Sequence, residues 1–128
     1  MKPVLQPSRV ASLMLLSAAV LACSREPAPV SFTGPVKPLL DAHCVECHVP
    51  GQAGYESSGL RLDSYEALMK GTRFGPIVLP GDALSSALTM LIEGRADPAI
   101  KMPHGKAPLS PEDQKTIRTW VEQGAPNN

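Results

Sequence analysis

The apolar residues of this chain fall into short stretches with helical spacing, separated by long segments rich in glycine and proline. In the first stretch, one face recurs at i, i+3, i+4, i+7 and i+8 through Val36, Leu39, Leu40, His43 and Cys44. Pro35 suits the first turn of such a helix. The pattern therefore predicts a helix that begins near Gly34.

A second helix is expected further along. Residues 49–59 contain several Gly and Ser and are expected to form a loop, and residues 60–62 form a short extended piece. Asp63 is the expected N-cap, with Glu66 three residues later completing a capping box. Gly71 then ends the helix.

Two more helices complete the pattern. The third runs from a cap at Asp82 to Gly94, and its inner face consists of Leu84, Leu88, Leu91 and Ile92. The fourth begins at Ser110 and ends at Gly124, with an inner face made of Ile117, Trp120 and Val121. Residues 95–108 between them are irregular. No strand pairing is indicated, so the sequence predicts a small all-α fold with long loops.

The N-terminus has the layout of an export signal. Lys2 and Arg9 precede an uncharged run over residues 10–22 that ends in small residues. Thirteen residues are fewer than the roughly 20 that a helix needs to cross a bilayer. We therefore expect a signal peptide at residues 1–22. A Pro-rich tether at 23–33 and a folded domain at 34–128 would follow it.

Cys23 directly follows the small residues of this signal. The sequence Val-Leu-Ala-Cys resembles a bacterial lipobox, so Cys23 is expected to carry lipid on the periplasmic side of a bacterial membrane. The alternative is an ordinary signal and a free Cys23. Removal of Lys2 and Arg9 would leave ten basic and twelve acidic residues. That balance gives no basic patch for nucleic acid.

Large side chains are scarce in the chain. It contains two Phe, two Tyr and one Trp, together with fourteen Pro. Loops bury little apolar surface, so this chain has few large side chains with which to fill a core of its size. A large apolar cofactor at the centre would make up the difference.

Residues 43–48, His-Cys-Val-Glu-Cys-His, contain two of the three cysteines and two of the three histidines. On one helical turn Cys44 and Cys47 point to the same side and can form thioethers with the vinyl groups of a haem. His48 then faces the iron from the proximal side. The Cys-x-x-Cys-His spacing is a specific signal for covalent haem c, and an exported chain is the setting that it requires.

Other uses of the two cysteines are weaker. If Cys23 is lipidated, a Cys44–Cys47 disulfide would close only a very short loop. A thioredoxin-like motif would need a βαβ context, which the pattern lacks. Zinc could take both cysteines with His48 and either His43 or His104, but a second ligand pair at finger-like spacing is missing.

The chain also resembles a family. The order of a helix, Cys-x-x-Cys-His, a loop with Met-Pro and a last helix with Trp is similar to class I cytochrome c. The segments Gly-Leu-Arg-Leu-Asp-Ser, Gly-Pro-Ile-Val-Leu-Pro-Gly-Asp, Met-Pro-His-Gly-Lys and Trp-Val-Glu-Gln-Gly-Ala resemble the Planctomycetes-type cytochrome c module. The resemblance spans residues 34–125 and implies a helical fold around one covalent haem, in which the first and last helices cross.

The distal iron ligand is the main open choice. Met69 and Met90 lie in amphipathic helices, where methionine usually serves as core. Met102 lies in a loop bounded by proline, which can present its thioether freely, and the family's Lys-Met-Pro motif implies the same ligand. His104 stands where the family usually has a second proline, so it is the competing ligand.

Other candidate residues have simpler interpretations. His43 is expected near the haem edge or in solvent and not as a ligand. Trp120 is expected to pack in the core, although its N–H could reach a haem propionate. Arg61 and Arg73 could also pair with propionates, but exposed charges are the default for both.

Two protein ligands on the iron would favour electron transfer over reaction with oxygen or peroxide. The sequence therefore predicts a lipid-anchored monohaem carrier of single electrons. It would exchange electrons with membrane-associated donor and acceptor proteins and would not itself be an enzyme. The alternatives are a haem peroxidase or sensor with an open sixth site, and an electron-transfer subunit of a larger oxidoreductase complex.

Overall fold

A computed structural model describes residues 28–128 of the chain, and the expected signal peptide and Cys23 lie outside this span. Within it, the elements in chain order are η1 (Phe32–Val36), α1 (Lys37–His43), α2 (Ala53–Ser58), α3 (Tyr65–Lys70), α4 (Ala87–Ile92), η2 (Pro98–Ile100) and α5 (Pro111–Glu122). No strand occurs between residues 28 and 128, where the only pairing is an isolated bridge from Thr72 to Gly75. The expected all-α fold is confirmed. None of the helices in this span is long and apolar enough to cross a bilayer.

The first helix is continuous from Phe32 to His43, with a π-helical turn at its start. The Ser31 hydroxyl caps it by accepting a hydrogen bond from the Gly34 N–H at 3.1 Å. Its inner face is buried, and Phe32 is only 4% exposed. Residues assigned to the tether thus belong to the core, and the packing begins before the boundary expected at Gly34.

Three aromatic rings join the first helix to α3 and α5. The centroid of Phe32 lies 5.1 Å from that of Tyr65 and 5.7 Å from that of Trp120. The Trp120 indole N–H donates to the Pro126 carbonyl at 3.0 Å, and the Tyr65 hydroxyl donates to the Ala125 carbonyl at 2.8 Å. Trp120 is therefore a core residue that packs on the first helix, and its N–H is not available for a propionate.

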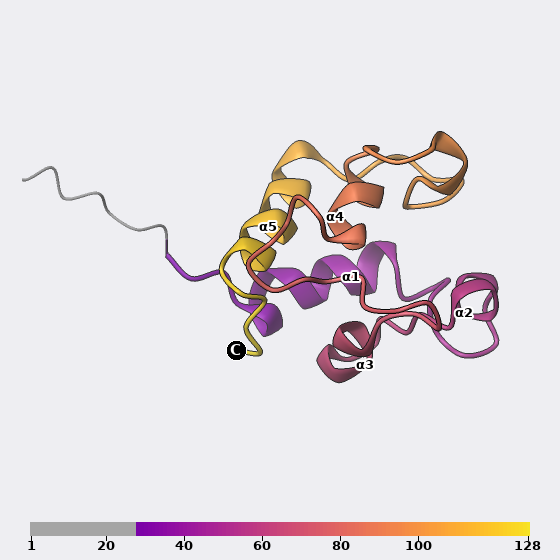
Figure 1. The fold of residues 1–128 in the computed structure, drawn as a ribbon, viewed down its shortest axis with the longest axis horizontal. Helices are drawn as coiled ribbons and strands as arrows, with labels where there is room; N and C mark the ends of the chain where they lie inside the picture. Colours follow the sequence, from indigo (N-terminus) through magenta and orange to yellow (C-terminus); the bar gives the residue numbers. More distant parts are fainter. Residues whose placement is uncertain (1–27) are drawn as a thin grey trace, which may run out of the picture.

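Helix α5 forms as the sequence predicts. The Ser110 hydroxyl accepts a hydrogen bond from the Asp113 N–H at 3.1 Å, which caps the first turn. The predicted inner face is fully buried. Helix α5 also contacts η1 and α4. The crossing of the first and last helices, which the family resemblance implies, is visible in Figure 1.

The short helices differ from expectation. Residues 53–58 form α2 where a loop was predicted. Ser64, and not Asp63, caps α3 by accepting from the Ala67 N–H at 3.2 Å. Asp63 is instead held by two hydrogen bonds from Arg61, at 2.7 and 2.9 Å.

Helix α4 also begins later than predicted. It starts at Ala87, because Asp82 caps only a separate turn by accepting from the Ser85 N–H at 2.9 Å. Leu84, expected on the inner face, is therefore 68% exposed. The inner face of α4 itself, with Leu88 and Ile92, is buried as predicted.

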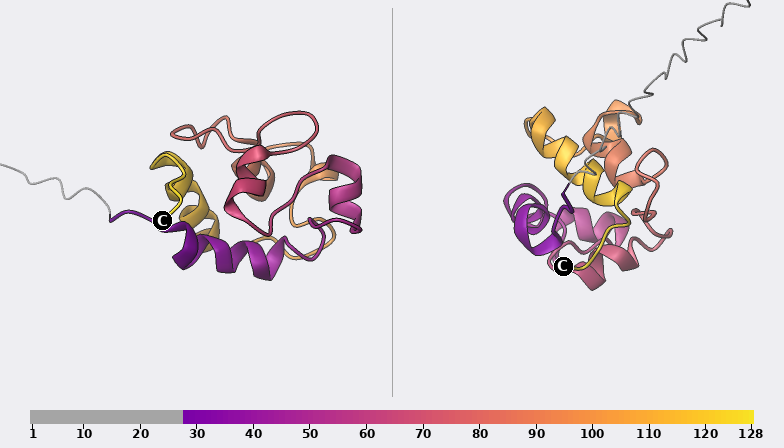
Figure 2. Two further views of the ribbon diagram at one scale, coloured as in Figure 1. Left: turned by 90° about the horizontal axis from the view of Figure 1, so that it is seen from below. Right: turned by 90° about the vertical axis from the view of Figure 1, so that its left-hand side faces the viewer.

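The molecule is elongated in the views of Figures 1 and 2. The start of the first helix and the end of α5 meet at one end, whereas α2 and the loop over residues 95–106 lie toward the other. The first helix runs between these ends. It delivers the Cys-x-x-Cys-His segment to the end remote from residue 28.

Candidate cofactor site

A cavity of about 400 Å³ opens where the first helix ends. This is within the range of roughly 300–1,000 Å³ that is typical of ligand and cofactor sites. Aliphatic side chains line its interior: Leu60, Leu62, Ile77, Leu88, Leu91 and Ile92. The only polar groups among the buried lining residues come from His48. An apolar lining of this kind excludes water and suits a large apolar group.

The Cys-x-x-Cys-His segment continues the first helix as a series of tight turns. The Cys44 N–H donates to the Leu40 carbonyl at 2.9 Å, and the His48 N–H donates to the Cys44 carbonyl at 3.1 Å. This winding brings the side chains of Cys44, Cys47 and His48 to the wall of the same cavity. The juxtaposition expected from the spacing is therefore present.

His48 is held in a defined position. It is only 8% exposed, and its Nδ1 atom has no hydrogen-bond partner. Burial lowers the pKa of its imidazole, although the nearby Leu60 backbone acts in the opposite direction. A buried neutral imidazole is the form that binds iron.

Gly54 of α2 packs against this ring, and sequence reasoning did not single it out. A Cβ atom at Gly54 would lie 2.9 Å from the His48 Cε1 atom and 2.7 Å from the Cys47 carbonyl oxygen. The Tyr55 N–H also donates to that carbonyl at 3.0 Å. Helix α2 thus closes directly over residues 44–48, which we call the attachment turn. No feature of the sequence marks Gly54, because the contact depends on how two segments approach each other.

Both cysteines of the site are free, and Cys47 is exposed. Burial, reinforced by the neighbouring Cys47, raises the pKa of Cys44 to about 11, so Cys44 is a neutral thiol. Thiols of redox-active Cys-x-x-Cys motifs have lowered pKa values instead. Among residues 28–128, no group of three or more His, Cys, Asp or Glu side chains is arranged to hold a metal ion, so the zinc alternative has no support.

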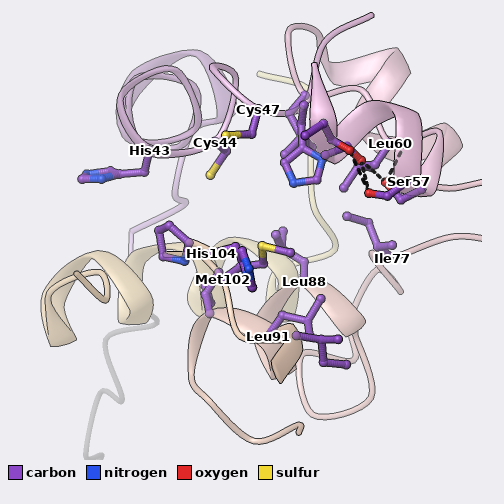
Figure 3. A pocket seen from close by; sticks show the side chains of 18 of the residues that line it. His43, Cys44, Cys47, Ser57, Leu60, Ile77, Leu88, Leu91, Met102 and His104 are labelled. Atoms are coloured by element: carbon purple, nitrogen blue, oxygen red, sulfur yellow. Dashed lines mark hydrogen bonds between the residues drawn. The ribbon is translucent and has the colours of Figure 1, made fainter. Parts of the chain in front are cut away.

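Across the cavity lies the loop that carries Met102. Figure 3 shows Cys44 and Cys47 on one side and Met102, Leu88 and Leu91 on the other. Met102 is half-buried against the core, and its N–H donates to the Leu91 carbonyl at 3.2 Å. Met69 packs against the core, and neither it nor Met90 lines the cavity. Of these three methionines, only Met102 is placed to serve as a distal ligand.

His104 and His43 lie at the edge of the cavity. His104 is exposed and lines the same side as Met102, so it remains the competing distal residue. The His43 ring points away from Met102 in Figure 3, as expected for a residue that is not a ligand. An ion pair between Lys106 and Glu46 joins the Met102 loop to the attachment turn.

The two arginines considered for propionates have other partners. Arg61 pairs with Asp63, and neither residue lines the cavity. Arg73 donates a hydrogen bond to the Glu56 carbonyl at 2.6 Å and also lies outside the cavity lining. Neither side chain is positioned toward the cofactor site.

The donor set fits a haem c. Two thiols, one buried imidazole with an unpaired nitrogen and one thioether surround an apolar cavity in an all-α fold. These features define a cytochrome of the c type.

Comparison with known families agrees. Residues 44–105 match the family described as Planctomycete cytochrome C, so this segment is similar to that family. The match supports a cytochrome c-type electron carrier with covalently bound haem c. Cys44, Cys47 and Met102 all lie within the matched segment. No curated protein and no solved structure matches the chain.

Proposed function

We propose that this protein is an exported, lipid-anchored cytochrome c that carries one haem and transfers single electrons. Cys44 and Cys47 form the thioethers, His48 is the proximal ligand and Met102 is the distal ligand. The observation that carries the proposal is that these four side chains, from two distant segments of the chain, line one apolar cavity.

The protein's own groups determine how the site works. The haem supplies an iron centre that accepts and releases one electron. His48 and Met102 would hold the iron from opposite sides of the cavity and leave no place for a substrate, and the aliphatic lining would keep water away from it. The thioether ligand raises the reduction potential. On this basis the protein is a carrier and not itself an enzyme.

Covalent attachment is tested by measuring haem in the purified protein. A pyridine haemochrome assay should give one haem per chain, and acidified organic solvent should not extract it. A Cys44→Ala, Cys47→Ala double variant should lose the covalent haem. The matched control, Cys23→Ser, should keep it. Extractable haem, or zinc in place of iron, would contradict the proposal.

Lipidation of Cys23 is supported by the sequence before it. The diacylglycerol group and an N-acyl chain together would hold the protein on the periplasmic side of the membrane, where a single acyl chain would bind only marginally. Wild-type protein should sediment with membranes, and Cys23→Ser should be released into the periplasm. If both forms sediment equally and are processed alike, Cys23 is not the anchor.

The redox partners follow from this location. A tethered carrier meets donors and acceptors at or near the same membrane at a raised local concentration. We propose that the partners are proteins of this kind, whether separate carriers or the other subunits of an oxidoreductase complex.

A further inference from the structure

The N-terminal segment leaves the domain at a fixed place. The Val30 N–H donates to the Gln123 side-chain oxygen at 2.7 Å, and the Gln123 side-chain N–H₂ donates to the Ala28 carbonyl at 3.3 Å. Both contacts tie the segment to the end of α5. The chain therefore enters the domain at the end where the first and last helices meet, as Figures 1 and 2 both show.

The exposed part of the cavity lining lies toward the opposite end (Figure 1). We call the loop over residues 95–106 the distal loop. The exposed lining residues of the cavity form a rim that belongs to the attachment turn, α2 and the distal loop: Cys47, Ala53, Ser57, Ala99, Ile100, His104 and Lys106. In Figures 1 and 2, α2 and the distal loop lie at the end remote from residue 28. We refer to these seven residues as the rim.

The length of the first helix separates these two places. Residues 32–43 span about 18 Å at the rise of an α-helix. The rim lies beyond the end of this helix, so the distance from the point of attachment to the rim exceeds that length.

The free tether is short by comparison. Since Ala28 is already held by α5, only the segment from Cys23 to Ala28 is available as a tether. Five residue steps span at most about 18 Å when fully extended. For the rim to face the lipid, the tether would have to run back along the whole first helix. The extended tether is only about as long as that helix, so it is too short to bring the rim, which lies beyond the helix, against the lipid.

We propose that the lipid anchor holds the rim away from the membrane, so that the site exchanges electrons with a redox protein that approaches from the aqueous side, and not with a quinol dissolved in the bilayer. The proposal rests on the lipidation of Cys23 proposed above. The rim suits a protein partner, because Ile100 is an apolar side chain 53% exposed and Glu46 neutralises the Lys106 charge.

The test compares three haem-loaded forms of the full chain. These are the lipidated wild type in phosphatidylethanolamine–phosphatidylglycerol vesicles, a variant with a 20-residue Gly-Ser insertion between Pro27 and Ala28 in the same vesicles, and soluble Cys23→Ser. The second-order rate of electron transfer to a small soluble blue copper protein is measured by stopped flow. We expect the three rates to agree within about threefold, because the rim is open to water in each form.

The opposite result is equally clear. A wild type that is slower than both other forms by more than about threefold would mean that the bilayer covers the rim, and the proposal would be overturned. Of the two vesicle-bound forms, only the long-tether variant permits the rim to reach the lipid, so it should oxidise a quinol dissolved in the bilayer faster than the wild type does. A wild type that oxidises this quinol as fast as the long-tether variant would also overturn the proposal.

Failure of the underlying anchor is recognised separately. If the wild type does not bind the vesicles, lipidation has failed, and the orientation that rests on it is overturned as well. Mass spectrometry of the mature N-terminus then identifies the cause.

Discussion

Gly54 lies so close to the His48 ring that it leaves no room for a side chain. A methyl group at Gly54 would lie within 3.0 Å of two atoms of the His48 ring. We expect Gly54→Ala to displace the ring or α2 and to lower the free energy of unfolding of the haem-loaded protein by about 1–3 kcal/mol, the usual cost of overpacking. Denaturant titration measures this, and the visible spectrum reports on the iron ligands.

Gly34→Ala is the matched control for that substitution. Its Cβ would lie 3.3 Å from the Ser31 Cβ, at the other end of the molecule. We expect it to leave the visible spectrum unchanged. Equal spectral effects of the two substitutions would contradict a specific role for Gly54.

Met102 distinguishes a carrier from a catalyst. Met102→Ala should abolish the far-red charge-transfer band of the ferric protein, lower the reduction potential and allow carbon monoxide to bind. Met69→Leu and Met90→Leu should keep the band, because such core exchanges usually cost less than about 1.5 kcal/mol. Visible spectroscopy with and without carbon monoxide checks each form.

His104 provides the opposing outcome for the same site. If His104→Ala loses the native spectrum while Met102→Ala keeps it, the ligation is bis-histidine. If neither substitution matters and the wild type already binds carbon monoxide, the sixth position is open. The protein would then be a sensor or peroxidase.

At the residue scale, the sequence was informative where chemistry depends on local spacing. Cys44, Cys47 and His48 are brought together by one helical turn, so their spacing alone placed them on one cavity wall. Met102 was predicted because a loop residue stands out among methionines that lie in helices, and the structure places it at the cavity. Gly54 could not be found in this way, since its importance arises from a contact between two separate segments.

Among the elements, the contact of α4 with α5 depends on one carboxylate. Glu93 accepts hydrogen bonds from the Arg118 guanidinium at 2.5 and 2.7 Å and from Arg95 at 2.5 Å, and its side chain is only 12% exposed. Glu93→Gln should lower the free energy of unfolding by about 1–2 kcal/mol, since it removes charge-assisted hydrogen bonds. Glu122→Gln, whose carboxylate is 51% exposed and 3.4 Å from Arg118, should cost less than about 0.5 kcal/mol. Equal costs would contradict this role.

The same carboxylate gives a pH dependence. Burial alone would raise the pKa of Glu93, but the hydrogen bonds from Arg118 and Arg95 outweigh it and hold the pKa below the ordinary value of 4.5. The contribution of the Glu93 carboxylate to the free energy of unfolding is therefore complete above pH 4.5. It is lost as the pH falls through the lowered pKa. The difference in unfolding free energy between wild type and Glu93→Gln should shrink over that acidic range. A constant difference between pH 7 and pH 3 would contradict the assignment.

Element boundaries were predictable only where a single capping residue was available. Ser110 has no rival and α5 begins as expected. Before α3, Asp63 and Ser64 are both good caps, and Arg61 decides between them by binding Asp63. Helix α2 was missed because its Gly and Ser residues have weak helix propensity. Packing against the attachment turn outweighs that propensity.

At the scale of the whole molecule, Phe32 joins the start of the first helix to α3 and α5 in one core. Phe32→Ala should lower the free energy of unfolding by about 3–5 kcal/mol, the usual cost of removing a buried ring. Phe74 makes a matched control, since it is 82% exposed at the tip of a loop. Phe74→Ala should change that free energy by no more than about 0.5 kcal/mol. Denaturant titration compares them, and similar losses would contradict the packing described.

The sequence predicted the fold class better than the extent of the folded domain. Helical spacing and the absence of paired strands were enough to predict an all-α chain. Phe32 was assigned to the tether because the residues around it are small or proline. Its burial depends on Tyr65 and Trp120, which are distant in sequence, so local composition carried no sign of it.

The position of Trp120 makes the two ends of the molecule separately observable. It is the single tryptophan of the chain, is fully buried beside Phe32 and does not line the cofactor cavity. Hydrogen exchange of its indole N–H, which is bonded to the Pro126 carbonyl, therefore reports on the end near the tether, whereas haem absorption reports on the end near the rim. If both signals change at one denaturant concentration, the domain unfolds as a single cooperative unit. If the absorption changes first, the rim can open while the anchored end stays folded.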